Sequence, residues 1–476
     1  MAEELNPDIC VIGGGPGGIA VAVAAANANI PVVLAEKGNL GGTNVSGTIP
    51  SKALIAAANR YEALRSGPLL GVTGAPLQVN LAKVHEHIRS AMDAVAANNS
   101  AERLSALGVT VIRAPVRFVD QRTAVAGDAT IRARRFVIAT GARPAAPRIP
   151  GIEDVDCLTF DTLFDATRKM GHLIVLGATR YGLELAQAYT RLGIDATVID
   201  DRPALADQDP ELVALVLERL HAEGIRIRDR TPIVAVARRR GGVRVTVAGR
   251  SEGEEIPVDG SHLLLATGSR PNVDGLSLDR AGIELDESGI KVDRQLRTTN
   301  SRVYAIGDVV AGAPSVSRAE HHADIVVKSA LQHALVRGDP DAAPAQVLTD
   351  PPLASVGLRE SEAEHRHRSI RVLRLPFSES DLAQTERATA GLIKVIATDR
   401  GQIVGAAAVG REAGEIIALW SLAIANRLDI SAIQSFVAPY PTRSDISRRA
   451  AATFTGLGLT PQPKWRIIDL LRKFGG

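Results

Sequence analysis

The sequence is poor in cysteine and in aromatic residues, and its charges nearly cancel. Two cysteines in 476 residues exclude a disulfide scaffold and a four-cysteine metal site. Cys10 and Cys157 lie far apart in the chain, so they do not form a CxxC-type pair. A formal net charge of +2 gives no indication of a nucleic-acid or membrane-surface protein. We therefore expect no metal site and no nucleic-acid partner.

Long apolar runs and leader-like segments are also missing from the sequence. The first eight residues, MAEELNPD, are acidic and lack the basic start of a secretory signal peptide. The most apolar early stretch, residues 19–34, is interrupted by Asn27, Asn29 and Pro31, which makes it unsuitable for spanning a bilayer. We therefore expect a cytoplasmic protein that does not contact a membrane.

Length and composition favour a multidomain α/β enzyme. Hydrophobic residues make up 45% and charged residues 23% of the chain, close to the average of soluble proteins, which excludes a disordered chain. At ~100–200 residues per domain, the length predicts about three domains. The 43 glycines and the 3% of aromatic residues favour an architecture with many tight backbone turns.

The first strong motif is a glycine-rich turn between a strand-like and a helix-like segment. The apolar run 8–12 leads into the turn 13–18, an Ala/Val-rich stretch follows, and residues 32–36 form a second apolar run. This βαβ unit is the context that a dinucleotide-binding fingerprint requires. The turn would offer backbone N–H groups and a helix N-terminus to a pyrophosphate, and Glu36 would accept hydrogen bonds from ribose hydroxyls. The turn residues expected at the ligand are Gly13, Gly15, Pro16, Gly17 and Gly18.

The same pattern recurs at residues 172–200 with one difference. Gly177 and Asp200 are separated by the same number of residues as the first glycine and Glu36 of the earlier unit, which predicts a second dinucleotide site. Thr179, however, stands where the middle glycine would let a pyrophosphate approach. Asp200 favours the free ribose of NAD(H) over a 2′-phosphate, although the nearby Arg202 weakens that argument. A Rossmann-like domain that binds its nucleotide poorly therefore remains an alternative.

Two further segments echo each other and indicate how the domains are connected. Residues 136–144 and 263–271 both read as a buried strand that runs into a Gly/Pro turn. Beyond residue 346 the pattern changes to alternating strands and a helix at 413–426. We predict an α/β protein with two Rossmann-like domains and a C-terminal α+β domain. The predicted domains are 1–150 with 271–345, 151–270 inserted between them, and 346–476.

A Gly/Ser/Thr-rich loop at residues 41–52 is the third motif. It enters a helix with Pro50 in the first turn, where backbone N–H groups can face an anionic or electron-rich group. Lys52 lies in the apolar run that follows. It is either a surface lysine that extends its charge to solvent or a buried charge that needs a partner. Glu184, on the first turn of the second Rossmann helix, is the partner that we expect.

The ordered set of these motifs resembles the flavoprotein disulfide reductases, which include dihydrolipoamide dehydrogenase, glutathione reductase and mercuric reductase. The resemblance rests on the two fingerprints, the ATGARP, ATGSRPN and YAIGDV segments and the GGT…GTIPSK loop, and it covers nearly the whole chain. It implies an FAD-binding homodimer in which the partner's third domain completes each active site. The residues expected at the FAD are Gly13, Gly15, Pro16, Gly17, Gly18, Glu36, Lys37, Gly42, Thr43, Lys52, Thr140, Gly141 and Asp308.

The chain departs from this family at its chemical centre. The family loop carries two cysteines that cycle between disulfide and dithiol. Here Thr48 stands at the flavin-proximal cysteine, and the other cysteine is replaced or deleted near Thr43 and Asn44. Threonine forms neither a thiolate nor a disulfide. At the position of the family's C-terminal acid/base histidine, this chain has Tyr440. The unperturbed pKa of a tyrosine, ~10, makes it a poor base at neutral pH. The dithiol relay is therefore lost as a unit.

Within the family, the GTIPSKAL and YPT segments resemble the soluble pyridine nucleotide transhydrogenases, which retain the first cysteine. Tyr440-Pro-Thr and the tail 465–474 also resemble mercuric-reductase-like flavoproteins, so the subfamily stays open. The basic amphipathic tail at 464–474 could touch a membrane surface, but packing on the protein's own dimer is the interpretation we favour. His321 and His322 are expected on a helix surface rather than at a metal, and Arg238–Arg240 at a solvated hairpin tip.

These observations predict an FAD-dependent NAD(P)H oxidoreductase that has no redox disulfide. Hydride would pass from the nicotinamide through the flavin directly to a second acceptor, which could be a nicotinamide nucleotide, a quinone or another small molecule. The expected catalytic residues are Lys52, Glu184, Thr48 and Tyr440, and those expected at NAD(P)H are Gly177, Tyr181, Gly182, Asp200 and Gly268. Two alternatives are a flavoenzyme with a non-nicotinamide donor and a non-catalytic, dimeric protein that holds FAD structurally.

Overall fold

The computed structural model describes residues 3–166, 169–331 and 342–456. The chain forms two compact units that divide after Asp350, and each is considered by itself. The C-terminal tail 464–474, which the sequence suggested to be amphipathic, lies outside the described residues. In the part of the chain that is described, no helix is both long and apolar enough to cross a membrane.

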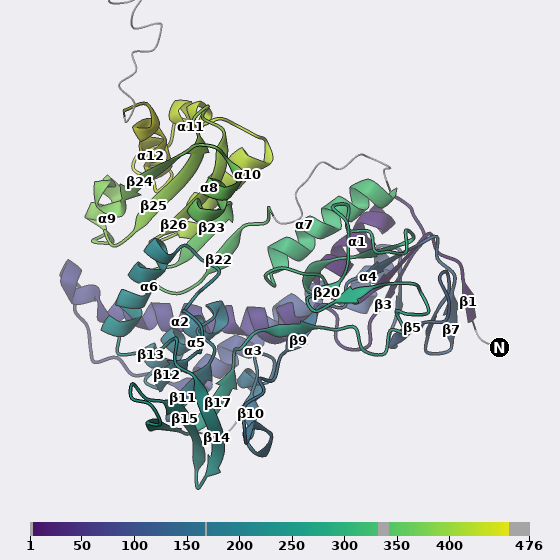
Figure 1. Ribbon diagram of the computed structural model, residues 1–476, viewed down its shortest axis with the longest axis horizontal. Coiled ribbons are helices and arrows are strands. Elements are labelled where there is room, and N and C mark those ends of the chain that lie inside the picture. The colour runs from purple at the N-terminus through teal and green to yellow at the C-terminus, as the bar shows by residue number, and fades with distance from the viewer. Residues whose placement is uncertain (1–2, 167–168, 332–341, 457–476) are drawn as a thin grey trace, which may run out of the picture. The chain divides into compact units, whose positions relative to one another are not determined.

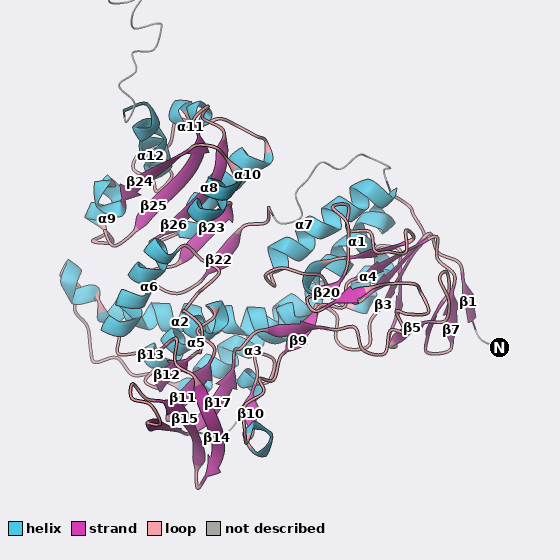
Figure 2. Ribbon diagram, viewed as in Figure 1, coloured by secondary structure: helices cyan, strands magenta, loops and turns pink. Residues whose placement is uncertain are grey.

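A parallel five-stranded sheet organises the first βαβ motif (Figures 1 and 2). Most residues of its strands are apolar and buried, as is typical of parallel sheets covered by helices. Helices α1 (Pro16–Asn27) and α7 (Val316–Val326) lie side by side and share a core with it. In spatial order the strands are β21 (Val303–Ala305), β8 (Arg135–Ile138), β2 (Ile9–Ile12), β3 (Val32–Ala35) and β4 (Val109–Ile112).

A small sheet packs against the opposite face of this five-stranded sheet and forms a separate core with it. The ring of Phe118 meets that of Phe136 edge to face, with centroids 5.2 Å apart, and both side chains are fully buried. The strands of this sheet are β1 (Glu3–Leu5), β7 (Ala129–Ile131), β6 (Ala124–Ala126) and β5 (Val116–Phe118).

A second parallel five-stranded sheet repeats the arrangement around the second βαβ motif. Helix α5 (Arg180–Arg191) follows the glycine turn, and α6 (Pro210–Ala222) precedes the last strand. The strand order is β10 (Cys157–Leu158), β17 (His262–Leu265), β11 (His172–Leu176), β12 (Asp195–Ile199) and β13 (Arg226–Arg228). An antiparallel sheet joins it, formed by β14 (Ile233–Arg239), β15 (Gly242–Ala248) and β16 (Glu255–Gly260). The arginine run 238–240 lies at the exposed β14–β15 hairpin, as expected.

The chain passes between the two sheets at one place. Strands β9 (Ala142–Pro144) and β18 (Ser269–Pro271) pair antiparallel there. The Thr140 hydroxyl donates to the Asn272 carbonyl oxygen at 2.7 Å, and the Asn272 amide donates to the Thr140 carbonyl oxygen at 3.0 Å. The two segments predicted to connect the domains therefore lie side by side, while the domain boundaries themselves stay predictions.

The predicted Gly/Ser/Thr-rich loop at 41–48 contains a helical turn of its own. Residues Asn44–Thr48 form one turn of π-helix that continues directly into α2 (Ile49–Arg65). Gly41 and Gly42 have positive φ angles of 93° and 52°, which let the chain reverse before this turn. Short π-helical turns are frequent at functional sites. Helix α2 packs against α5 and against α3 (Leu81–Asn98), which α4 (Ala101–Ala106) follows.

The second unit has the predicted α+β character. Its antiparallel strands follow the order β23 (Leu353–Gly357), β26 (Ile403–Val409), β25 (Leu392–Thr398) and β24 (Ile370–Pro376). Trp420 is fully buried in its core, and its Nε1–H donates to the Ser447 hydroxyl at 3.0 Å. The helices are α8 (Glu360–Arg366), α9 (Asp381–Thr385), α10 (Ala413–Ala425), α11 (Ile430–Ser435) and α12 (Asp445–Gly456).

Candidate functional site

The two glycine turns have nearly the same backbone geometry. Gly13 and Gly177 have φ angles of 109° and 112°, and a Cβ atom would lie 2.4 Å from the Ala139 oxygen in the first and 2.3 Å from the Ala266 oxygen in the second. A Cβ atom at Gly18 or Gly182 would come within 2.0 or 2.1 Å of the carbonyl oxygen of the first glycine. Glycine is therefore required at both places for the strand and helix to pack closely.

The turns differ at the middle position. Gly15 precedes α1, and a Cβ atom there would meet nothing within 4 Å, so a pyrophosphate can approach the helix N-terminus, and the first turn fits the phosphates of FAD. In the second turn the Thr179 hydroxyl donates to the Ala266 carbonyl oxygen at 2.9 Å and accepts the Gly182 N–H at 3.4 Å. Thr179 thus uses its side chain to cap α5.

Each acidic residue at the end of the βαβ unit ties its own turn together. Glu36 accepts the N–H groups of Gly14 and Gly38, both at 2.6 Å. Asp200 accepts the N–H of Ala178 at 2.7 Å and that of Arg202 at 2.9 Å, and it is only 5% exposed. Lys37, next to Glu36, is exposed to solvent.

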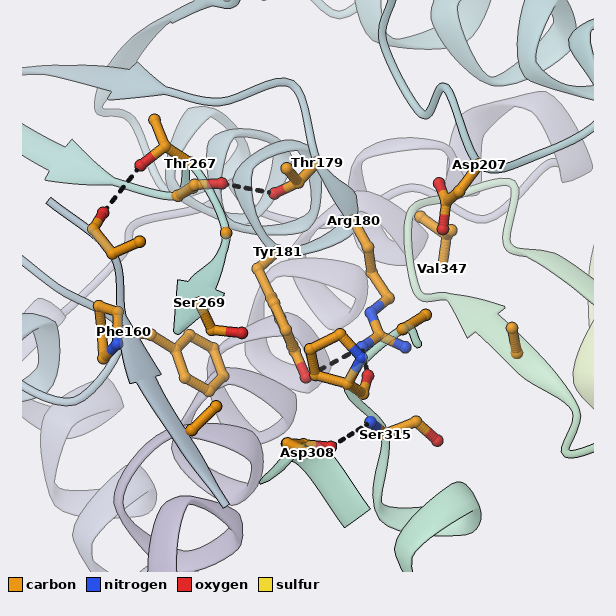
Figure 3. Close-up of a pocket in the computed structure, with 18 of the residues that line it drawn as sticks. Phe160, Thr179, Arg180, Tyr181, Asp207, Thr267, Ser269, Asp308, Ser315 and Val347 are labelled. Atoms are coloured by element: carbon orange, nitrogen blue, oxygen red, sulfur yellow. Dashed lines mark hydrogen bonds between the residues drawn. The ribbon is translucent and has the colours of Figure 1, made fainter. Parts of the chain in front are cut away.

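A cavity of about 830 Å³ in the first unit lies between the glycine turn of the second sheet and the loop 41–48 (Figure 3). Several predicted site residues line it, but the first glycine turn and Lys52 do not belong to its walls. The predicted residues on the walls are Thr43, Thr48, Tyr181, Asp200, Gly268 and Asp308.

Phe160, Tyr181 and Arg180 pack against one another in the wall of this cavity. The rings of Phe160 and Tyr181 lie 4.4 Å apart, and the Arg180 guanidinium lies 4.6 Å from the Tyr181 ring centroid. Arg180 also donates to the Tyr181 hydroxyl at 3.2 Å and to the Pro314 carbonyl oxygen. Burial raises the pKa of Tyr181, and the charge of Arg180 acts against this rise. Sequence reasoning missed Phe160, since nothing in its local pattern distinguishes it from a core residue.

Asp308 forms part of the cavity wall at the end of β21. It accepts the Ser315 N–H at 3.2 Å. Burial raises the pKa of its carboxyl group, and the Ser315 bond and the charge of Arg318 oppose the rise. Gly141, which follows β8 on the same sheet, has a positive φ of 66° and open space where a Cβ atom would lie. Both residues thus follow strands at the carboxyl edge of the first sheet, where ligands bind in α/β folds.

Lys52 and Glu184 lie in contact with each other. The Lys52 Nζ atom is 2.5 Å from the Glu184 carboxylate, and their side chains are 29% and 1% exposed. The other Glu184 oxygen accepts the Leu348 N–H at 2.7 Å. Lys52 Nζ lies 5.7 Å from the Tyr181 ring centroid. The charge of Lys52 is therefore held in a fixed place by a buried carboxylate.

Tyr440 belongs to the second unit and lies at its surface, 73% exposed. Its hydroxyl donates to Asp381 at 3.0 Å, and this bond, together with the charge of Asp381, raises the pKa of the phenol. The Asp445 carboxylate does not accept the Tyr440 hydroxyl. It instead accepts hydrogen bonds from the side chains of Arg448 and Arg449. The Tyr440 hydroxyl therefore stays protonated at neutral pH even more completely than that of an ordinary tyrosine.

The expectation of two surface histidines is wrong for His322. This side chain is fully buried on the inner face of α7, and its Nδ1 atom accepts the Gly307 N–H at 3.1 Å. The tight turn at Gly307 leaves that N–H without a backbone partner, and the histidine satisfies it. Among the described residues, no group of His, Cys, Asp and Glu side chains could hold a metal ion.

Comparisons with known proteins identify the family. Residues 7–323 match the model of the pyridine nucleotide-disulphide oxidoreductases, and residues 343–451 match the dimerisation domain of the same family. The chain belongs to the pyridine nucleotide-disulphide oxidoreductases. A mercuric reductase from Streptomyces lividans is 33% identical, over 94% of this chain and 96% of its own. A dihydrolipoyl dehydrogenase from Bacillus subtilis (strain 168) is 31% identical, over 95% and 97%. The crystal structure of LpdA from Mycobacterium tuberculosis matches with a TM-score of 0.85 and 28% identity, over 94% and 99%.

Membership of the pyridine nucleotide-disulphide oxidoreductases confirms the fold class and the cofactors predicted from the sequence. The protein is a flavoprotein oxidoreductase that uses FAD and NAD(P)H, and its dimerisation domain supports a homodimer. The roles assigned to single residues stay predictions.

Proposed function

We propose that the protein oxidises NAD(P)H with FAD and passes the electrons directly to a small-molecule acceptor, without a redox disulfide. The observation that carries this proposal is the loop 41–48, which contains no cysteine and contributes Thr48 to the cavity that the second glycine turn borders. FAD, when bound, supplies the two-electron carrier between the nicotinamide and the acceptor.

The two cysteines are poorly suited to replace the missing pair. Burial raises the pKa of the Cys10 thiol to about 12. The pKa of Cys157 is also raised, by burial and by the charge of Asp156. A thiol acts as a nucleophile or a metal ligand only as the thiolate. The family is named after a disulfide substrate, and one relative after the mercuric ion. Acceptors that need no thiol, such as a second nicotinamide nucleotide or a quinone, therefore suit this chain better than either of these.

The buried ion pair would support the chemistry by electrostatics. Lys52 would hold a positive charge near the electron carrier, and Glu184 would keep that charge in place through its bond to the Leu348 N–H. A fixed cation in a site with little water stabilises developing negative charge more than a mobile one does. Thr48 and Tyr181 would position the reactants, and Tyr440 of the dimerisation domain would not act as a base at neutral pH.

NADH is the donor that the second turn favours. Asp200 places a buried carboxylate where the adenosine ribose would bind, and a carboxylate repels the 2′-phosphate of NADPH. The Arg202 guanidinium lies 3.7 Å from Asp200 and is 62% exposed, so most of its charge faces solvent and is screened.

A stopped-flow experiment tests the proposal. Anaerobic mixing of the holoenzyme with NADH should bleach the visible flavin absorption, and oxidised quinone or nicotinamide nucleotide should restore it. The double variant C10S/C157S should behave like the wild type, because neither thiol takes part. Flavin that stays oxidised at saturating NADH and NADPH would sink the proposal, and so would loss of turnover in the cysteine-free variant.

Thr179 favours a second candidate, a flavoenzyme that uses another donor. Its hydroxyl occupies the Gly182 N–H that a pyrophosphate would need. The variant T179G reopens the turn and distinguishes the two, with T179S as the control that retains the cap. A T179G variant without any gain in NADH affinity favours the other donor. Stoichiometric FAD with no turnover towards nucleotides, quinones or oxygen would instead indicate a binding protein.

A further inference from the structure

The segment at residues 159–162 packs directly on the loop that lacks the cysteines. The Ser46 hydroxyl donates to an oxygen of the Asp161 carboxylate at 3.0 Å. The ring of Phe160 lies against the next loop residue, because a Cβ atom at Gly47 would come within 2.2 Å of two ring carbons. Two neighbouring residues of the loop thus meet two neighbouring residues that are far away in the sequence.

The Phe160 ring is itself held from its other side. Its centroid is 4.4 Å from that of Tyr181, and Tyr181 and Thr48 line the same cavity. Residues 46 and 47 are therefore each fixed by a different contact, next to Thr48 on the cavity wall. These contacts and that of Tyr181 with the ring come from the segment after β10 and from the first turn of α5, which both belong to the second sheet and its helices.

We propose that Phe160 and Asp161 form a clamp that fixes the loop 46–48 and so takes the place of a covalent cross-link within it. Both are positioning residues, since they act on Thr48 through the loop. The clamp requires glycine at position 47, because the backbone of Gly47 has no positive φ and only the closeness of the ring excludes a larger side chain. The inference rests on the proposed site, in which Thr48 faces the FAD, but its test does not depend on turnover.

The hydrogen bond is tested on the FAD-loaded protein with D161A and D161N. Asparagine retains an oxygen that accepts the Ser46 hydroxyl, whereas alanine does not. Loss of a hydrogen bond to a charged group corresponds to about a tenfold change or more in an equilibrium. We expect D161A to weaken FAD binding about tenfold, to change the visible flavin spectrum and to shift the flavin midpoint potential, while D161N stays near wild type. S46A should match D161A, with no added effect in the double variant.

The ring contact is tested by a second cycle that stands even if D161A does not fold. G47A should perturb the flavin spectrum and potential in the wild-type background, because its methyl group collides with Phe160. In the F160A background the same substitution should have little effect. Equal effects of G47A in both backgrounds, or wild-type FAD affinity, spectrum and potential in D161A, would overturn the clamp. A protein that is not reduced by NADH, yet shows these spectral effects, would contradict the proposed function and leave the clamp supported.

Discussion

The expected role of Asp308 at the FAD conflicts with the stability of the folded protein. Burial raises the pKa of its carboxyl group above the unfolded value of ~3.9. Such a group favours folding only while it is protonated, and its contribution is lost as the pH rises through the folded pKa. At neutral pH the burial of this carboxyl group therefore opposes folding of the FAD-free protein.

The variant D308N should for this reason be more stable than the wild type at pH 7 when FAD is absent, and the difference should vanish towards pH 4. FAD affinity should fall about tenfold or more, because a charged acceptor for the cofactor is lost. Urea unfolding of the FAD-free protein at both pH values and a fluorescence titration with FAD measure the two effects. Lower stability of D308N at pH 7 would contradict the argument.

Lys52 compensates the charge of the buried Glu184 carboxylate. Without its partner, the Glu184 carboxylate would be left buried, and among the described residues only the Leu348 N–H would still donate to it. We expect K52M to destabilise the protein by about 1–3 kcal/mol, less than for a fully buried pair because Lys52 is partly exposed, and to slow flavin reduction. E184Q keeps the bond to Leu348 and should cost less. Urea unfolding and stopped-flow absorbance measure the two effects, and equal stability of K52M and the wild type would refute the prediction.

At the scale of elements, a buried arginine joins three helices of the first unit. Arg191 on α5 is 3% exposed in its side chain and forms a two-pronged bond with Glu223, which follows α6. It also donates to Asn59 on α2 at 2.6 Å and to Asp350 at 2.7 Å. The helix that carries Lys52 and the helix that carries Glu184 are thus fixed to each other away from the cavity.

Removal of this arginine should therefore disturb more than one element. We expect R191M to lower the free energy of unfolding by about 3 kcal/mol, since it removes a buried arginine that bonds two carboxylates and, among the described residues, leaves Glu223 paired with Arg219 alone. R65M is the matched control, because Arg65 bonds Glu62 from an exposed position and should cost at most about 1 kcal/mol. Denaturant unfolding of both variants measures the loss in free energy of unfolding. Similar losses would show that the bonds of Arg191 stabilise the protein no more than an exposed ion pair does.

Whether a residue's place in the structure can be predicted from the sequence depends on whether local sterics or tertiary contacts determine it. Gly13 and Gly177 could be identified because local sterics demand glycine where the φ angle is positive and a carbonyl oxygen lies close. Phe160 could not, since its partners Gly47 and Tyr181 are brought to it only by tertiary packing. His322 was misplaced for the same reason: the N–H that it satisfies comes from a distant turn. The π-helical turn at 44–48 likewise leaves no periodic pattern in five residues.

At the scale of the whole molecule, the family's dimerisation domain leads to a test by subunit mixing. The resemblance to the family implies that Tyr440 of one chain completes the site that contains Lys52 of the other. If so, mixing K52M with Y440A should restore about a quarter of the wild-type activity, because random assortment gives half heterodimers with one intact site each. Steady-state turnover after unfolding and refolding together measures this. Activity no higher than that of the separate variants would place both residues in the same chain's site, or exclude Tyr440 from it.

The pairing of strands β9 and β18 affects how a protein of this kind can evolve. Because the chain leaves the first sheet and returns to it through adjacent antiparallel strands, the ends of the stretch between them lie close together. A stretch with neighbouring ends can be exchanged as one cassette without reconnecting the rest of the chain. A related enzyme's cassette, joined at Ala142–Pro144 and Ser269–Pro271, would then bring its own donor preference with it, while the loop at 41–48 would stay behind and meet a new neighbour at position 160.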